Sequence, residues 1–234
     1  IETRLMALHD HNEQQMVESV LKRLLDGQKI ALVSDAGMPL SSDPGPRLVR
    51  AVIEAGLPLT GVPGANAALM ALQLSGLPPD RFLFAGFPPN KATARQKWLA
   101  SLADVPATLI FYESPNRLAA ALADMAAVFG PRAAAVSREL TKQFEETRRG
   151  GLDTLARHYA DQGAPKGEVS LCVAGPLPPE AVGEAEIDAA LQQALETASV
   201  KVAAAEVAER LGLPKRSVYQ RAITLRKGES TEGK

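Results

Sequence analysis

The sequence predicts an α/β protein made of two α/β domains and a small helical module at its C-terminal end. Short apolar runs alternate with helical patterns over residues 30–174, which favours sheets covered by helices. A Gly- and Pro-rich linker follows at residues 175–179, and beyond it the composition shifts to Ala, Glu and Leu. We place the two domains at residues 1–77 and 78–176, and the module at residues 184–227.

The first domain is predicted from two apolar runs that end in turns rich in Gly and Pro. Residues 30–33 and 57–62 have the β-branched composition of short buried strands. Gly37, in the first turn, lets the backbone approach a ligand closely, and small residues at 63–68 follow the second run and lead into a helix. A helical stretch at 47–55 separates the runs, so we expect parallel pairing and one crevice lined by both turns. An ordinary strand-to-helix turn is the alternative for each.

The other elements follow from periodicity and turn residues. Apolar residues at three- and four-residue spacing predict a helix at 13–25, which Gly27 closes. Residues 76–80 form the linker between the two domains. We expect a helix at 69–75 before this linker. After it we expect strand 81–87, a basic helix at 91–98, strand 107–112, helix 116–129, strand 133–137, a polar stretch at 138–149 and strand 168–174.

Composition excludes several classes of protein. No apolar run reaches the length of about 18 residues that a transmembrane helix needs, and no signal peptide is evident. Cys172 is the single cysteine and lies in an apolar run, so we expect a buried thiol, no disulfide within the chain and a reducing cytoplasm. His9 and His11 lack a third convergent ligand, so no metal site is expected.

Two charged segments follow strands of the second domain and carry possible chemistry. Glu113 and Arg117 lie in the first segment, and Glu139 and Lys142 lie in the second. Solvated loops with weak surface ion pairs are the alternative explanation. If the strands are parallel, both segments lie on the same side of the sheet as the earlier turns.

The C-terminal module has the pattern of a helix-turn-helix. Helical residues 200–211 and 215–225 are joined by a short turn that contains Gly212 and Pro214. Residues 201–227 contain seven Lys or Arg and two Glu, although the formal net charge of the chain is −1. Such a local basic patch is typical of nucleic-acid binding, and a helical hairpin with a solvated basic face is the alternative.

Six motifs, in this order and spacing, carry a resemblance to a known family: SDAGMPLSSDPG, VPGANAA, DRFLFAGFPP, TLIFYESPNRL, SRELTKQFEE and KGEVSLCVAG. They resemble the ribosomal RNA small subunit methyltransferase I family, in the tetrapyrrole-methylase-like class of S-adenosylmethionine enzymes. The resemblance covers residues 1–175, and many members also end in a helix-turn-helix. It implies two α/β domains with the methyl donor in the cleft between them, and a homodimer. The implied reaction methylates the ribose 2′-hydroxyl of a cytidine in small-subunit ribosomal RNA, within the assembled subunit.

The resemblance also assigns residues to this reaction. S-adenosylmethionine is expected along the first turn and against the second, at Asp35, Ala36, Gly37, Met38, Ser41, Asn66, Ala67, Glu113 and Leu140. A ribose hydroxyl needs a base, for which Glu139 and Glu113 are the candidates, with Lys142 as an orienting partner. Phosphates of the RNA are expected at Arg138, Lys142, Arg148 and Arg149.

The sequence departs from the family in three places. Met38 stands where members usually have Thr, and Ala65 where they have Pro, and neither change removes a charge. Members also begin with a strand, a Gly-rich turn resembling TPIGNL and an acidic EDTRHT segment, which precede the equivalent of Ile1. Part of the donor site is therefore expected outside these residues, and a protein that began at Ile1 is expected to bind the donor weakly or not at all.

Two other functional classes stay open at this point. A C-methylase acting on a tetrapyrrole precursor would share the donor turns but would have no need of a basic helical module. A DNA-binding regulator would depend on the helix-turn-helix alone.

Overall fold

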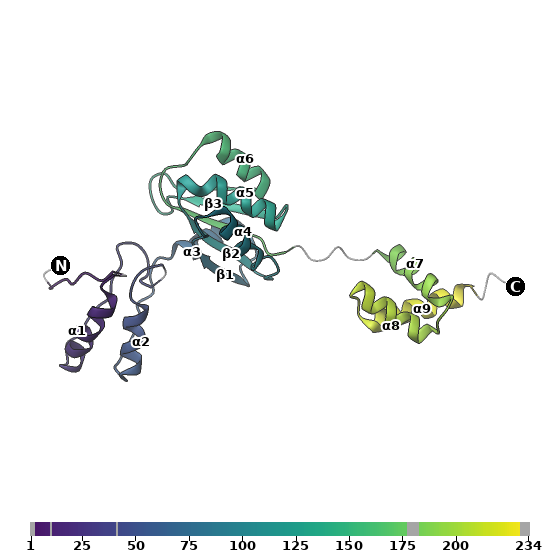
Figure 1. The fold of residues 1–234 in the computed structure, drawn as a ribbon, viewed down its shortest axis with the longest axis horizontal. Coiled ribbons are helices and arrows are strands. Elements are labelled where there is room, and N and C mark those ends of the chain that lie inside the picture. The colour runs from purple at the N-terminus through teal and green to yellow at the C-terminus, as the bar shows by residue number, and fades with distance from the viewer. Residues whose placement is uncertain (1–2, 10, 41, 177–182, 230–234) are drawn as a thin grey trace. The chain divides into compact units, whose positions relative to one another are not determined.

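The computed structural model describes residues 3–9, 11–40, 42–176 and 183–229, with side chains up to residue 226 (Figure 1). The chain divides into two compact units, Ile1–Pro176 and Leu177–Lys234. Both α/β domains expected from the sequence fall in the first unit, and the boundary between them, at residues 77 and 78, stays a prediction.

The N-terminal part of the first unit is a pair of helices. Helix α1, Glu13–Leu25, packs against α2, Pro46–Glu54. The Glu13 carboxylate is buried and accepts hydrogen bonds from the backbone N–H groups of Arg47 at 2.8 Å and Leu48 at 3.4 Å. Because the N-cap of α2 is a glycine, this carboxylate satisfies N–H groups that the helix itself leaves without partners.

The strands predicted at residues 30–33 and 57–62 are wrong, because both segments are irregular. A strand is stable only when its backbone N–H and C=O groups pair with a neighbour. The described residues supply no neighbouring strand to either segment. Several of their apolar side chains are consequently solvent-exposed, among them Val33, Leu59 and Val62.

One five-stranded sheet forms the core of the first unit, with strand order β1-β2-β5-β3-β4. β1 and β2 are parallel, and the other neighbouring pairs are antiparallel. Its strands are β1 Phe82–Gly86, β2 Thr108–Glu113, β3 Ala133–Arg138, β4 Glu146–Gly151 and β5 Val169–Val173.

Four of these strands, β1, β2, β3 and β5, confirm predictions from the apolar runs. β4 lies partly in the stretch expected to be only polar, because its sequence, ETRRGG, has no apolar alternation to indicate a strand. The strand forms as the edge partner of β3, with Val136 opposite Arg148. Tertiary pairing has overridden local composition here.

Strand β5 lies between β2 and β3 and is antiparallel to both. β2 and β3 are therefore parallel to each other, and their carboxyl ends lie at the same edge of the sheet. Val169 pairs with Glu113 on one side and with Arg138 on the other. The two charged segments therefore share one end of the sheet, as predicted, whereas the two earlier turns do not follow strands of this sheet.

Helices cover both faces of the sheet. Alternation along β2 directs Leu109 and Phe111 to one face, and Ile110 and Tyr112 to the other. Ile110 packs with α3, and the opposite face carries the larger hydrophobic core. The covering helices are α3 Ala67–Ser75 on one side and α4 Ala92–Ala100, α5 Leu118–Phe129 and α6 Leu152–Gln162 on the other, with a 3₁₀ turn, η1 Pro115–Arg117, before α5.

Cys172 is buried on the α3 face of the sheet, as the sequence predicts. Burial raises the pKa of its thiol to about 12, opposed only in part by a hydrogen bond with Ser75. The thiol therefore stays neutral at physiological pH and packs as a small hydrophobic residue.

Helix α6 lies in residues for which the sequence periodicity predicts no element.

The second unit is a bundle of three helices around its own apolar core. Gly212, at φ +63°, ends the second helix and turns the chain toward the third. The helices are α7 Glu184–Leu195, α8 Val200–Leu211 and α9 Lys215–Glu229. The helices predicted at 200–211 and from residue 215 onward are confirmed, and no helix among the described residues is long and apolar enough to cross a membrane.

Candidate functional site

The two Gly-rich turns of the first unit lie against each other. Gly37 has φ +73°, and a Cβ placed on it would lie 3.1 Å from the carbonyl oxygen of Ala65. A Cβ placed on Gly64 would lie 3.5 Å from Cγ of Met38. The structure thus brings together the two turns that the sequence analysis assigns to one crevice, although no strand pairing holds them there.

Helix α3 begins at the second of these turns. Asn66 is its N-cap, and the side-chain Oδ1 accepts a hydrogen bond from the Leu69 backbone N–H at 3.0 Å. Ala67 is the first helical residue. The Asn66 side chain therefore fixes the backbone at the predicted donor position, and its oxygen is already engaged in that role.

Tyr112 connects these turns to the sheet, and sequence reasoning missed it. Its phenol oxygen accepts a hydrogen bond from the Ala68 backbone, and its ring packs edge-on against Phe84 and Phe87, with centroids 4.8 and 5.6 Å away. Burial, followed by the negative charge of Asp43 in the first turn, raises the Tyr112 pKa. Period-two alternation from the buried Ile110 was the signal that places Tyr112 on this face.

The first turn holds one engaged and one unengaged carboxylate. Asp43 accepts a hydrogen bond at 2.7 Å from the Ser34 hydroxyl. Asp35 is exposed, and no described residue forms an ion pair or hydrogen bond with its side chain. Met38 is partly exposed beside them, and Ser41 lies outside the described residues.

Unusual backbone conformations gather in the segments that carry predicted site residues. Four described residues other than Gly have positive φ: Leu40 (74°), Ser42 (70°), Glu139 (50°) and Thr141 (66°). Left-handed backbone is costly for side chains of these types, above all for a β-branched Thr. Such strain is found preferentially at functional sites. The two segments therefore qualify as parts of a site on geometry that is independent of their sequence motifs.

Glu139 is held in a defined position near the sheet edge. Its carboxylate accepts hydrogen bonds from Nζ of Lys142 at 2.9 Å and from the Glu168 backbone N–H at 3.1 Å. These two bonds, the one from Lys142 first, lower the Glu139 pKa. The side chain keeps 18% of its surface exposed. The next residue, Leu140, packs against the hydrophobic cluster between α3 and the sheet.

Glu113 occupies a different environment. Its side chain is fully buried, accepting hydrogen bonds from the Ser114 backbone N–H at 2.7 Å and from Arg117 at 3.2 Å. Burial raises its pKa, and these partners oppose the shift. The Arg117 guanidinium also donates to the Pro88 carbonyl, so the carboxylate anchors the loop after β1. Alternation along β2 directs Glu113 to the opposite face from Tyr112.

The four basic residues predicted to hold RNA all have partners within the chain. Arg138 and Arg148 both pair with Glu146, at 2.9 and 2.8 Å. Lys142 pairs with Glu139 and Glu168, and Arg149 donates to the Leu74 carbonyl at the end of α3, at 2.9 Å. RNA contact by these residues stays a prediction, and it would have to share or replace these bonds.

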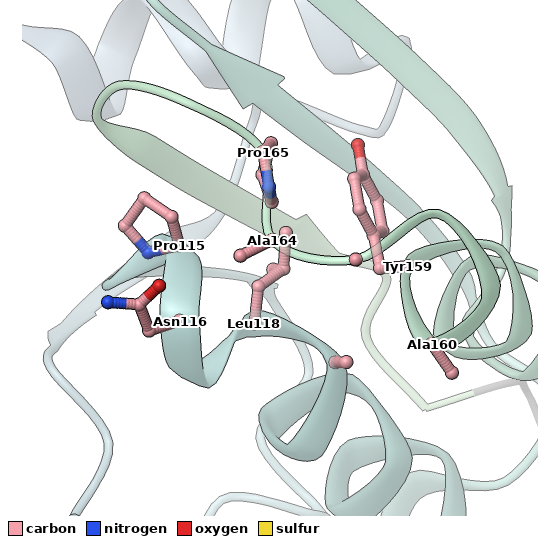
Figure 2. Close-up of a pocket in the computed structure, with 9 residues that line it drawn as sticks. Pro115, Asn116, Leu118, Tyr159, Ala160, Ala164 and Pro165 are labelled. Carbon is pink, nitrogen blue, oxygen red and sulfur yellow. The ribbon is translucent and has the colours of Figure 1, made fainter.

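A pocket of about 200 Å³ lies between the start of α5 and the end of α6 (Figure 2). Leu118, Tyr159 and Pro165 are among the residues that line it. It is on the side of the sheet opposite α3, so we do not assign the donor to it. Within the described residues, no group of three or more His, Cys, Asp or Glu side chains could hold a metal ion.

Comparison with known proteins decides the family. The model for tetrapyrrole (corrin/porphyrin) methylases matches residues 3–156, and that for the RsmI C-terminal HTH domain matches residues 181–226. The chain belongs to the tetrapyrrole methylase family. Its fold class is thereby confirmed, together with the identity of the C-terminal module.

Relatives within this tetrapyrrole methylase family are similar over nearly the whole chain. Ribosomal RNA small subunit methyltransferase I of Mesorhizobium japonicum is 47% identical over 234 residues, which is 100% of this chain and 79% of that protein. The protein of the same name from Pseudomonas aeruginosa is 44% identical over 236 residues, covering 98% of this chain and 83% of the relative.

Solved structures of the tetrapyrrole methylase family share the fold at low sequence identity. The methyltransferase CobJ superposes with a TM-score of 0.52 at 21% identity, over 73% of this chain and 74% of its own. Uroporphyrin-III-C-methyltransferase of Thermus thermophilus superposes with a TM-score of 0.50 at 21% identity, over 69% and 71%. These likenesses concern the fold alone.

Mutation of Gly37 tests whether the contact between the two turns is needed to bind the methyl donor. We expect Gly37→Ala to weaken binding of S-adenosylmethionine at least about tenfold, because the added methyl group pushes against the Ala65 carbonyl and separates the turns. Gly56→Ala is the matched control, since Gly56 also has positive φ but nothing lies near its Cβ position. Isothermal titration calorimetry measures the affinity of both variants for S-adenosylmethionine. Equal affinities for the two variants would contradict the assignment of the turns to the donor.

Proposed function

We propose that this chain transfers the methyl group of S-adenosylmethionine to the ribose 2′-hydroxyl of a cytidine in small-subunit ribosomal RNA. One observation carries the proposal, the identity of 44–47% over nearly the whole chain with relatives named ribosomal RNA small subunit methyltransferase I. The match of the C-terminal module to the RsmI C-terminal HTH domain supports it. A C-methylase of tetrapyrrole precursors is less well supported, because it would not need that basic module.

The turns at the start of the first unit fit the methyl donor. The close approach of Gly37 to Ala65 leaves backbone, not side chains, at the surface where a ligand would bind. Met38 offers a partly exposed apolar side chain, and the Asp35 carboxylate complements the positive sulfonium of the donor. We assign donor binding to these turns at Asp35, Ala36, Gly37, Met38, Ser41, Asn66 and Ala67, with Leu140 beside them. When bound, S-adenosylmethionine supplies the electrophilic methyl group.

We assign the acceptor of the hydroxyl proton to Glu139. A general base must first reach its substrate, and Glu139 is partly exposed while Glu113 is fully buried. The lowered Glu139 pKa keeps its carboxylate ionised at neutral pH. Lys142 orients it through the bond at 2.9 Å, and Glu113 acts as a positioning residue through Arg117. Orientation of hydroxyl and donor supplies the rest of the acceleration.

The RNA and the assembly complete the proposal. Arg138 ends β3, Lys142 lies in the loop after it, and Arg148 and Arg149 lie on the edge strand β4. These four residues are proposed to contact phosphates in exchange for some of their present partners. We also propose a homodimer, in which exposed apolar side chains such as Val33 and Val62 would be covered, and a cytoplasmic location, which suits the single buried cysteine.

The reaction is tested by incubating the chain with methyl-labelled S-adenosylmethionine and one of three acceptors: assembled small subunits, naked small-subunit RNA or a porphyrinoid. We expect label in RNA, at a 2′-O-methylcytidine that resists alkaline hydrolysis. Label only in the porphyrinoid would replace the proposal with the C-methylase. Sequence-specific binding of duplex DNA, without transfer to any acceptor, would replace it with the DNA-binding regulator.

The proposed base is tested by comparing Glu139→Gln with Glu113→Gln. We expect Glu139→Gln to lower kcat by about 100-fold or more, because the amide cannot accept the proton. Glu113→Gln should change kcat much less, since Glu113 does not take the proton and the single amide oxygen can still accept one of the two hydrogen bonds that the carboxylate accepts from Ser114 and Arg117.

The pH dependence separates the two carboxyl groups further. Because the Glu139 pKa is lowered from its ordinary value of about 4.5, the Glu139 carboxylate is ionised at any pH above that value. We therefore expect that kcat does not fall as the pH is lowered through the neutral range. An acidic limb near neutral pH that Glu113→Gln abolishes would transfer the role to Glu113, whose pKa burial raises.

A further inference from the structure

The C-terminal module separates its charges between two of its helices. Residues 184–195, which form α7, include three acidic side chains and no basic one. Residues 215–226 of α9 include four basic side chains and no acidic one. Helix α8 carries both signs, with Glu206 and Glu209 near Arg210 in the sequence. The basic character of the module is therefore concentrated on α9.

Arg221 is the cation that joins these two helices. Its guanidinium donates to both carboxylate oxygens of Asp188, each at 2.7 Å, and pairs with Glu184 at 3.1 Å. The bond with Asp188 lowers the Asp188 pKa, so the pair is charged at neutral pH. Arg221 thus serves the packing of α7 on α9 and is not free for an external partner.

On the opposite side of α9, Arg216 and Tyr219 form no ion pair or hydrogen bond with any described residue. Val218 and Ala222 face the core of the module. Arg216, Tyr219, Gln220 and Ile223 follow at spacings of three, four and seven residues, so they form one stripe on the side away from that core. We call this stripe, together with Lys215 at its edge, the outer face of α9.

The outer face has the chemistry of an RNA-binding surface. Arg216 and Lys215 are exposed, and no described residue forms an ion pair with either. Tyr219 leaves 42% of its surface in solvent, without a ring or hydrogen-bond partner in the described part of the module. The basic candidates of the first unit, in contrast, are all engaged within the chain.

We propose that the outer face of α9 binds a single-stranded segment of the substrate RNA, with an unpaired base stacked on Tyr219 and phosphates held by Arg216 and Lys215. An exposed aromatic ring beside cations fits unstacked bases. Paired RNA is a poorer fit, because the deep, narrow major groove of the A-form helix does not admit a recognition helix. The inference rests on the proposed function and adds a second place where the enzyme holds its RNA.

Fluorescence anisotropy of the full chain tests the proposal, with a labelled single-stranded RNA and a labelled perfect RNA hairpin as probes. We expect Tyr219→Ala to weaken binding of the single strand about tenfold and to leave the hairpin unaffected, while Tyr219→Phe retains wild-type affinity. Arg216→Glu should weaken binding of the single strand. The slope of log K against log salt concentration should also become shallower, by about 0.7 for each phosphate that the variant no longer neutralises.

Lys97→Glu is the matched charge control, because Lys97 is exposed on α4 of the first unit. It should bind both probes as the wild type does, and circular dichroism should show all variants folded. Wild-type affinity for the single strand in both Tyr219→Ala and Arg216→Glu would overturn the proposal. That result would leave the proposed reaction intact if the chain still methylates RNA. Conversely, a chain that binds RNA through Tyr219 but methylates no RNA would overturn only the reaction.

Discussion

The position of β5 between β2 and β3 is the constraint on which the rest of the first unit depends. Antiparallel pairing on both sides makes β2 and β3 parallel to each other and brings Glu113 and Arg138 to either side of Val169. A shift of β2 by one residue against β5 would exchange the two faces of β2, placing Tyr112 under α5 and Glu113 under α3. The site near α3 therefore depends on the register of β2 against β5.

Alternation across that sheet also divides the work of neighbouring residues. Tyr112 and Glu113 are adjacent in the chain, yet one contacts the start of α3 and the other anchors the loop after β1 through Arg117. Burial raises the pKa of both groups, so titration alone does not separate their roles. The direction of the two side chains does separate their roles, because only side chains on the α3 face of the sheet can reach the two turns.

The amino-acid sequence predicts most of the fold and part of the site. Strands in the second half of the first unit are found because runs such as 107–112 are apolar and β-branched, whereas β4 was missed because its pairing comes from β3 and not from its own composition. Residues 30–33 have a strand-like composition, but no strand among the described residues pairs with them, so the local pattern predicted the wrong structure there. The positive φ of Glu139, and the burial of Glu113, depend on tertiary contacts that a motif does not reveal.

The central claim is that the two turns bind the methyl donor. A titration with S-adenosylhomocysteine, monitored through amide chemical shifts by NMR, tests it most directly. The account places the ligand at the contact between Gly37 and Ala65, so we expect the largest shifts at residues 35–40 and 64–68 and in Tyr112. The pocket around Leu118 and Tyr159 provides an internal comparison on the other side of the sheet. Saturable shifts confined to that pocket, with none at the two turns, would contradict the account.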